Sequence, residues 1–386
     1  MKPVRGGFAA PPGPVAPGAP PYGTGTLADV LPSAAGVLQV SGFEDVLGLQ
    51  GSEPAPEAVT VLLIDGLGWA PWHDLTDLTP TLAALGRRRL STTVPSTTPT
   101  ALASLGTGMS PGTHGIVGAS FWLPDEERLL HPLSWGDDPH PRAVQPEPTV
   151  FERVAAAGLP VVSVGPSAYA ESGLTRAVLR GGEYAGSDST DAIVDAITGQ
   201  RRGLGYAYVP DLDRTGHVHG VDSPEWREGL RAVDALVARV LERLPAGHML
   251  IVTADHGMVD CPPASRVSVE ALPAFDRVIT VAGEPRLRHV YCQPGSQGEV
   301  LQAWRDALGE RAFVLDREEA VSLGLFGPTE GDYAERIGDV VVLARGDTVL
   351  VSEVDPLVSG LLGQHGSVTE QEMGIPLLQA RGQARG

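Results

Sequence analysis

The sequence predicts an α/β fold in which a mainly parallel β-sheet is sandwiched between helices, with a small α+β lobe inserted. Continuous β-branched and apolar runs, such as VTVLLID at residues 59–65, are typical of parallel strands buried on both faces. Helical stretches separate these runs, as right-handed crossovers between parallel strands require. The length of 386 residues is enough for a large core with one smaller lobe.

The predicted elements alternate along the chain. After residue 65, helices are expected around residues 80–85 and, built from small residues, from about Pro99 to Leu105. Further helices are expected at TVFERVAAAG, TDAIVDAITGQ and SPEWREGLRAVDALVARVLERL, and strands at LPVVSVG, LGYAYVP and HMLIVTAD. Strands that alternate with helices in this way favour a sheet covered on both faces.

Two segments differ from this alternation. Residues 1–26 are rich in Pro, Gly and Ala and have few long apolar side chains, so we expect a disordered arm before a main domain at residues 27–386. Residues from about 276 to 330 mix short strands with helices and predict the inserted lobe. The chain is then expected to return to the core through DVVVLARG.

Charge and composition exclude several classes of protein. A net charge of −19 at pH 7 argues against a nucleic-acid polymer as partner, and 42% hydrophobic residues argue against a mostly disordered chain. No apolar run approaches the roughly 20 residues of a membrane helix, and Pro and Gly interrupt every stretch that could act in a signal peptide. Cys261 and Cys292 cannot form a disulfide framework. We therefore expect a cytoplasmic protein without a membrane partner.

Polar side chains follow three of the predicted strands at their carboxyl ends. Asp65 ends the first run, Asp213 and His217 follow LGYAYVP, and Asp255 and His256 follow HMLIVTA. In an open parallel sheet the ligand crevice lies beyond these ends. The second pair has the spacing of one helical turn, and a glycine after the third pair allows a bend. Carboxylate oxygens combined with imidazole nitrogens suit Zn²⁺, with Mn²⁺ or Fe²⁺ as competitors.

Hydroxyl side chains occur at the start of the predicted small-residue helix. Free backbone N–H groups and the helix dipole favour a phosphate oxygen at such a position. The alternative is that Ser96, Thr97 and Thr98 only cap the helix. A strand-end aspartate taken alone can also be a cap or turn residue. Three such ends in the order of a single crevice favour the binding interpretation.

Five sequence strings together resemble the alkaline phosphatase superfamily and, within it, the type I phosphodiesterase and nucleotide pyrophosphatase family. The strings are LLIDGLGW, PSTTPTALASLGTGMSPGTHGIVG, PDLDRTGHVHG, VTADHGM and GQHGS, which follow the family's order between about residues 59 and 378. The resemblance implies an alkaline phosphatase-like catalytic domain and a hydrolase of phosphate esters. It also implies a small phosphate ester or a nucleotide as substrate.

The resemblance implies a site for two divalent metal ions, with zinc as the expected metal. The residues that match the family's ligands are Asp65, Thr98, Asp255 and His256 for one ion, and Asp213, His217 and His365 for the other. Thr98 matches the family's nucleophile, which would attack phosphorus in line and form a phosphothreonine. His365 is identified by the GQHGS string alone.

The sequence departs from the family pattern after HGIVG, where members often have an asparagine that donates to the phosphoryl oxygen. Ala119 and Ser120 stand there, and Ser120 is the candidate substitute. A sulfatase is rejected because Cys261 and Arg266 do not fit C-x-P-x-R. A phosphomonoesterase, a phosphomutase and a silent metal-binding relative stay open as alternatives. No Arg or Lys lies within residues 92–118 to meet the extra charge of a monoester, and no oligomeric state is indicated.

Overall fold

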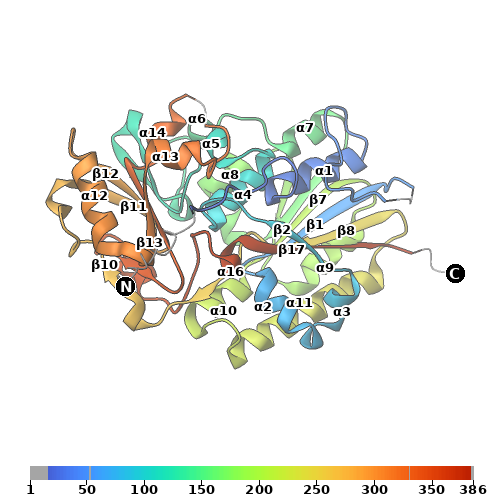
Figure 1. Cartoon of the computed structure of the whole chain (residues 1–386). Helices are drawn as coiled ribbons and strands as arrows, with labels where there is room; N and C mark the ends of the chain where they lie inside the picture. The colour runs from blue at the N-terminus through green and yellow to red at the C-terminus, as the bar shows by residue number, and fades with distance from the viewer. Residues whose placement is uncertain (1–15, 52–53, 330, 384–386) are drawn as a thin grey trace, which may run out of the picture.

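A seven-stranded sheet forms the centre of the computed structural model, which describes residues 16–51, 54–329 and 331–383 (Figure 1). Its strands are, in spatial order, β2 (Arg88–Ser91), β17 (Gly374–Arg381), β8 (His248–Thr253), β1 (Ala58–Ile64), β7 (Gly203–Val209), β5 (Val161–Gly165) and β6 (Glu183–Gly186). The five strands from β8 to β6 run parallel, and β17 is antiparallel to both of its neighbours. The prediction of a mainly parallel sheet is confirmed.

Helices cover both faces of this sheet (Figure 1). One face carries α1 (Val30–Val37), α4 (Thr98–Thr107), α7 (Val150–Ala156) and α8 (Gly173–Val178). The other carries α2 (Trp69–Asp74), α3 (Pro80–Ala84), α9 (Thr190–Gly199), α10 (Asp211–His219) and α11 (Pro224–Arg243). Every residue of β1 and of β7 is buried, because both faces of these central strands are covered. No helix in the described ranges combines the length and hydropathy needed to cross a bilayer.

The remaining helices and strands are short. They are α5 (Pro111–His114), α6 (Pro141–Val144), α14 (Tyr333–Arg336), α15 (Pro356–Ser359) and α16 (Glu370–Met373), with the strand pairs β3 (Phe121–Leu123) and β4 (Arg128–Leu130), β9 (Val259–Asp260) and β16 (Gly363–Gln364), and β10 (Arg266–Ser268) and β15 (Val349–Val351). The β9–β16 pair is antiparallel and brings the GQHGS string beside the segment that follows β8.

The lobe contains a second, antiparallel sheet and extends farther than predicted. Its strands are, in spatial order, β11 (Val278–Glu284), β12 (Leu287–Cys292), β14 (Val340–Ala344) and β13 (Ala312–Asp316), accompanied by α12 (Gln297–Leu308) and α13 (Arg317–Ser322). The run DVVVLARG therefore supplies an inner strand of the lobe instead of a return to the core. The chain returns through β17, a strand that was not predicted.

The two faces of β14 explain this difference. Val341 and Leu343 pack in the main hydrophobic core, whereas Val340 and Val342 pack in a separate lobe cluster with Trp304 of α12. All five residues of the strand are buried. A strand between two cores has the same continuous apolar sequence as a strand of the central parallel sheet, so the two cannot be distinguished by pattern alone.

The predicted N-terminal arm is only partly within the described residues, because residues 1–15 lie outside them. Residues 16–26 pack against the domain instead of forming a disordered segment. The Tyr22 hydroxyl donates to the carbonyl oxygen of Leu325 at 2.9 Å and accepts from the amide of Val94 at 3.3 Å. Thr26 forms a β-bridge with Ser91 of β2. Composition does not show such specific anchors, which offset the entropy of ordering a Pro- and Gly-rich segment.

Candidate active site

Five of the seven predicted ligand residues follow three adjacent strands, β8, β1 and β7, at their carboxyl ends. Asp65 directly follows β1, Asp213 and His217 lie on α10 after β7, and Asp255 and His256 follow β8. The parallel register of these strands places their ends level with one another. The structure therefore brings the three sequence clusters to one edge of the sheet.

One group of possible ligands consists of Asp65, Asp255 and His256, whose ligand atoms all lie within 4.8 Å of one another. His256 Nε2 lies 3.4 Å from Asp65 Oδ1 and 3.5 Å from Asp255 Oδ2. Asp255 Oδ1 accepts hydrogen bonds from the amides of Gly66 and His256 at 3.1 and 3.0 Å, so this carboxylate is held on one side. All three side chains are buried, and none is more than 5% exposed.

The second group consists of Asp213, His217 and His365, which satisfy the same 4.8 Å criterion. Asp213 and His217 are four residues apart on α10, and Asp213 Oδ2 lies 3.3 Å from His217 Nε2. His365 Nε2 lies 3.3 Å from His217 Nε2 and 3.8 Å from Asp213 Oδ1. The rings of His365 and His256 stack with 3.7 Å between their centroids, so the two groups adjoin.

Main-chain carbonyl groups fix the tautomer of all three histidines. Nδ1 of each ring contacts a carbonyl oxygen, with His217 on Gly363 at 2.7 Å, His256 on Gly257 at 3.0 Å and His365 on Ser96 at 3.0 Å. A carbonyl oxygen only accepts, so Nδ1 carries the proton and donates it. Each Nε2 is then left with a lone pair that faces the carboxylates, as in histidines that bind metals.

The carboxylates also fit bound cations. Asp65 Oδ1, Asp213 Oδ1 and Asp255 Oδ2 are buried and have no hydrogen-bond partner within the described part of the chain. Burial, and then the neighbouring carboxylates Asp255 and Asp213, raise the pKa of Asp65 well above its ordinary value. Burial likewise raises the pKa of Asp213. Three buried carboxyl groups and three imidazole lone pairs form a donor set that suits divalent metal ions such as Zn²⁺.

Thr98 lies beside the first group, at the start of α4. Its Oγ1 is 3.2 Å from His256 Nε2, and the residue is 8% exposed. Thr97 is the N-cap residue of α4, but its side chain makes no capping hydrogen bond, and the Ser96 hydroxyl donates to the carbonyl oxygen of Ser367 at 2.7 Å. Neither Ser96 nor Thr97 therefore performs the capping role that was the alternative to a site.

The Ser120 hydroxyl, the predicted substitute for the family's asparagine, is bonded to Gly283 of the lobe. This hydroxyl donates to the carbonyl oxygen of Gly283 at 3.1 Å and accepts from the amide of the same residue at 2.9 Å. The residue is 6% exposed and is absent from the lining of the cavity beside Thr98. The side chain instead joins the segment after HGIVG to β11 of the lobe, which the sequence did not indicate.

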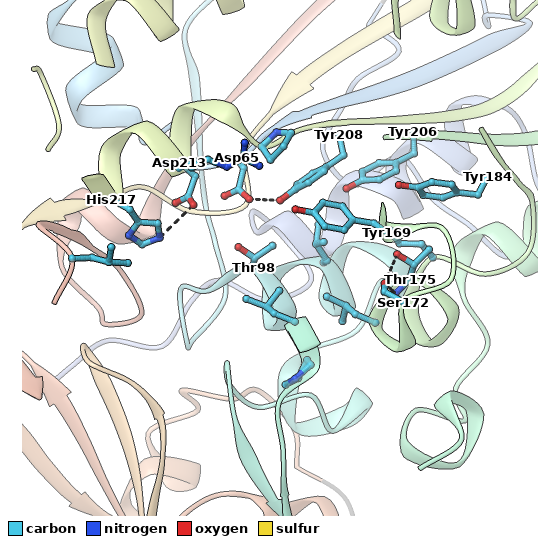
Figure 2. Close-up of a pocket in the computed structure, with 18 of the residues that line it drawn as sticks. Asp65, Thr98, Tyr169, Ser172, Thr175, Tyr184, Tyr206, Tyr208, Asp213 and His217 are labelled. Carbon is cyan, nitrogen blue, oxygen red and sulfur yellow. Dashed lines mark hydrogen bonds and ion pairs between the residues drawn. The ribbon is translucent and has the colours of Figure 1, made fainter. Parts of the chain in front are cut away.

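A cavity of about 380 Å³ opens beside Thr98 and extends away from the ligand groups. Its wall is formed mainly by aromatic and aliphatic side chains, namely Leu102, Pro132, Leu133, Tyr169, Leu174, Leu179, Tyr184, Tyr206, Tyr208, Pro210, Val218 and Leu361. In Figure 2, Tyr208, Tyr206 and Tyr184 lie successively farther from Asp65. Arg214 is the one cationic side chain among the described lining residues; it is 68% exposed and 3.5 Å from Asp211.

The tyrosine hydroxyl groups in the cavity differ in their partners. Tyr208 donates to Asp65 Oδ2, and Tyr184 donates to the carbonyl oxygen of Pro166 at 3.1 Å. The Tyr206 hydroxyl is buried and has no partner among the described residues. Sequence analysis missed these residues. A signal was present, because Tyr206 and Tyr208 alternate at the end of LGYAYVP and therefore share one face of β7.

The model of the type I phosphodiesterase / nucleotide pyrophosphatase family matches residues 59–368. The chain belongs to this family. The match includes every predicted ligand residue, from Asp65 to His365. The phosphodiesterase fold seen here is that of the alkaline phosphatase superfamily.

Solved structures of similar fold include murine ectonucleotide pyrophosphatase / phosphodiesterase 5, with a TM-score of 0.67, 19% identity, and coverage of 84% of this chain and 88% of that one. Phosphonoacetate hydrolase from Sinorhizobium meliloti 1021, in complex with phosphonoacetate, has a TM-score of 0.65, 19% identity, and coverage of 86% and 92%. Phosphopentomutase from Anaeromyxobacter dehalogenans strain 2CP-C is 34% identical over 130 residues. That match covers 33% of this chain and 32% of the mutase, so the chain spans about a third of that relative's length.

Proposed function

We propose that the chain is a metal-dependent phosphodiesterase of the nucleotide pyrophosphatase type, with Thr98 as its nucleophile and two divalent ions, expected to be zinc, as cofactors. The observation that carries the proposal is the cavity beside Thr98. The candidate ligands Asp65, Asp213 and His217 line part of this cavity, and the rest of its wall is mainly aromatic and aliphatic. A diester has a second organic group on phosphorus, and this cavity supplies a place for it.

The residues of the chain prepare Thr98 for in-line attack. Its position at the first turn of α4 places the oxygen where the helix dipole favours negative charge. Tyr208 orients Asp65 through the hydrogen bond to Oδ2, and the carbonyl groups of Gly257 and Ser96 orient His256 and His365. Divalent ions held by these residues would lower the pKa of the Thr98 hydroxyl and offset the phosphoryl charge.

The cavity also favours a particular kind of substrate group. Arg214 is largely exposed and lies close to Asp211, and no other described lining residue is cationic. Aromatic and aliphatic walls favour a group with an apolar body and few charges. The proposed substrate is therefore a diester with at least one aromatic or other predominantly apolar group. A nucleoside is one such group.

A phosphomonoesterase or phosphomutase is the second candidate, because phosphopentomutases match about a third of the chain. Arg214 is the residue that could meet the additional negative charge of a monoester at the cavity mouth. In that case Arg214→Gln would lower kcat/KM for monoesters more than for diesters. Equal effects on both classes would argue against a role of Arg214 in monoester binding.

The cytoplasm remains our proposed location, and both cysteines support it. Cys261 and Cys292 are free and buried. Burial raises the pKa of each thiol to about 12, so neither is poised to form a thiolate. Such cysteines are compatible with a reducing compartment.

A substrate panel on zinc-loaded protein tests the proposed function. It compares bis-4-nitrophenyl phosphate, 4-nitrophenyl phosphate and a pentose 1-phosphate as substrates for diesterase, monoesterase and mutase activity. The proposal predicts the highest kcat/KM for the diester. A preference for the monoester, or transfer of phosphate within the pentose, would contradict it.

A further inference from the structure

One buried carboxyl group of the lobe lies close to the site without belonging to either ligand group. Glu284 is the last residue of β11 and is 4% exposed. Neither of its carboxyl oxygens makes a hydrogen bond of standard geometry within the described residues. Burial raises the pKa of Glu284 to about 8, an effect opposed by the nearby Thr97 hydroxyl and by Arg288. Burial therefore favours the protonated form of this carboxyl group.

The side chain of Glu284 packs against Gly366, the residue after His365. A β-carbon on Gly366 would lie 2.5 Å from Glu284 Cγ and 2.7 Å from Cδ, distances that real side chains do not tolerate. The φ of Gly366 is +129°, which also favours glycine. The loop that carries His365 is thus shaped around the Glu284 side chain.

Hydrogen bonds join this loop to the segment that precedes the nucleophile. Ser96 accepts from His365 Nδ1 at its carbonyl oxygen and from the Gly366 amide at its hydroxyl, at 3.0 and 3.1 Å. The Ser96 amide donates to the Gly366 carbonyl oxygen at 3.2 Å. Thr97, the next residue, interacts with the carboxyl group of Glu284. Glu284 therefore packs against Gly366 of one segment and lies near Thr97 of the segment that is hydrogen-bonded to it.

The position of Glu284 is itself fixed by the neighbouring backbone. The Gly283 amide donates to the carbonyl oxygen of Ser120 at 2.9 Å, and the Ser120 hydroxyl contacts the same residue. On the other side, Arg286 makes a buried ion pair with Glu372, with Nη2 and Oε2 2.7 Å apart. The turn after β11 is thus anchored to the main domain before and after Glu284.

We propose that Glu284 is a positioning residue of the site, through which the lobe holds Thr98 and His365 in their relative places. It does so by filling the space against Gly366 and by its interaction with Thr97. The proposal rests on the proposed function for the role of Thr98, but the effect on His365 is independent of any activity. In this role Glu284 contacts neither substrate nor metal.

Removal of the side chain should therefore affect geometry at two points. A shift of the segment that carries Ser96 into the vacated space would displace Thr98, and a displacement of about 1 Å can reduce turnover by about 100-fold. The same shift would loosen His365, and loss of ligand support commonly weakens metal binding by about 10- to 100-fold. The walls of the substrate cavity do not include Glu284, so KM should change little.

Three variants of the full chain test the proposal. Glu284→Ala removes the support, and Glu284→Gln retains its shape and its capacity for a neutral hydrogen bond. Asp339→Ala is the control for loss of lobe stability, because Asp339 binds the Cys292 amide and Arg317 within the lobe. Each variant is measured for Zn²⁺ affinity by competition with a chelator, for kcat and KM on an aryl phosphodiester, and for melting temperature.

We expect Glu284→Ala to bind the weaker of its two Zn²⁺ ions at least 10-fold less tightly and to lose at least 10-fold in kcat, with KM within about 2-fold of wild type. Glu284→Gln should stay within 3-fold of wild type in all three quantities. Asp339→Ala should lower the melting temperature without these losses.

Unchanged Zn²⁺ affinity and kcat in Glu284→Ala would overturn the proposal, and so would equal losses in Asp339→Ala or in Glu284→Gln. If wild type hydrolyses no diester, the proposed function fails, and the Zn²⁺ measurements alone still decide the role of Glu284.

Discussion

At the scale of single residues, the capacity of the site to bind metal ions depends on which nitrogen of each histidine carries the proton. The three histidines carry their proton on Nδ1 because each ring faces a main-chain carbonyl group. Their Nε2 lone pairs face buried carboxylate oxygens that have no hydrogen-bond partner within the described residues. Buried electron-pair donors that face one another are destabilising unless cations lie between them. The donor arrangement is therefore the physical reason for expecting metal ions.

Tyr206 permits a prediction about substrate recognition. Its buried hydroxyl lines the cavity without a partner, so Tyr206→Phe removes a group that only a bound substrate can satisfy. For a 4-nitrophenyl phosphodiester whose second group is 4-hydroxyphenyl, we expect KM to rise about 3- to 10-fold, the equivalent of one neutral hydrogen bond. The matched phenyl diester is the control and should show no change. An equal effect on both diesters would mean that the hydroxyl does not bind substrate.

Glu284 permits a prediction about the pH dependence of stability. Its pKa in the folded protein is about 8, above the ordinary 4.5, so the unfolded chain releases this proton at lower pH than the folded chain. The contribution of Glu284 to stability is complete below about pH 4.5 and is lost as pH rises toward 8. Relative to Glu284→Gln, wild type should lose about 1.4 kcal/mol in unfolding free energy per pH unit in this window. Urea titrations of both proteins at pH 5, 6.5 and 8 measure this difference in unfolding free energy. A difference that does not change with pH would contradict the prediction.

The sequence allowed the ligand residues to be proposed because strand ends are visible in it. Asp65 and Asp255 follow long apolar runs, and the edge of a parallel sheet brings such positions together. His365 was proposed only through the family resemblance. Glu284 could not be identified from the sequence, because its role depends on a contact with Gly366, 82 positions away in the numbering. The hydrogen bonds between Ser120 and Gly283 of β11 could not be foreseen either, because 163 positions separate these residues.

At the scale of elements, β14 and the N-terminal segment differ most from expectation. An inner strand of the lobe and a strand of the main sheet have the same apolar pattern, so sequence predicted β14 as a strand but not its sheet. The N-terminal segment shows the opposite case. Its composition predicts disorder, but the Tyr22 hydroxyl accepts a hydrogen bond from the Val94 amide and donates one to the carbonyl oxygen of Leu325. Single anchors of this kind leave no periodic signal.

The anchor at Tyr22 can be tested by removing its hydroxyl. Tyr22→Phe leaves the Leu325 carbonyl group and the Val94 amide without this partner, so we expect a loss of about 1–3 kcal/mol in unfolding free energy. Urea denaturation measures it. Tyr333→Phe is the control, because the Tyr333 hydroxyl makes no hydrogen bond within the described residues, and it should change stability by less than about 0.5 kcal/mol. Equal stability of Tyr22→Phe and wild type would show that the hydroxyl is not an anchor.

At the scale of the whole molecule, the lobe and the main domain share a buried ion pair. Arg286 lies in the turn between β11 and β12, and Glu372 lies on α16, directly before β17. Both side chains are fully buried, and two hydrogen bonds of 3.0 and 2.7 Å join them. The lobe is thereby attached at the place from which Glu284 reaches the site.

The Arg286–Glu372 pair should be more costly to break than to replace. Glu372→Gln leaves a buried guanidinium without its counter-charge, so we expect a loss of about 3–5 kcal/mol in unfolding free energy. Replacing both residues with methionine removes the charges together and should cost less than the single change. A double-mutant cycle by urea denaturation measures the difference. A double variant less stable than Glu372→Gln would contradict this account.

The central claim, that Thr98 attacks phosphorus at a two-metal site, is tested most directly by the turnover of Thr98→Ala on an aryl phosphodiester, measured alongside zinc content. We predict a loss of several powers of ten in kcat with about two zinc ions retained, because Asp65, Asp255 and His256 still surround the first position. Thr97→Ala is the matched control and should keep far more turnover than Thr98→Ala, because it retains the Thr98 hydroxyl and loses no capping hydrogen bond. Full activity of Thr98→Ala, or an inactive Thr97→Ala beside an active Thr98→Ala, would contradict the claim.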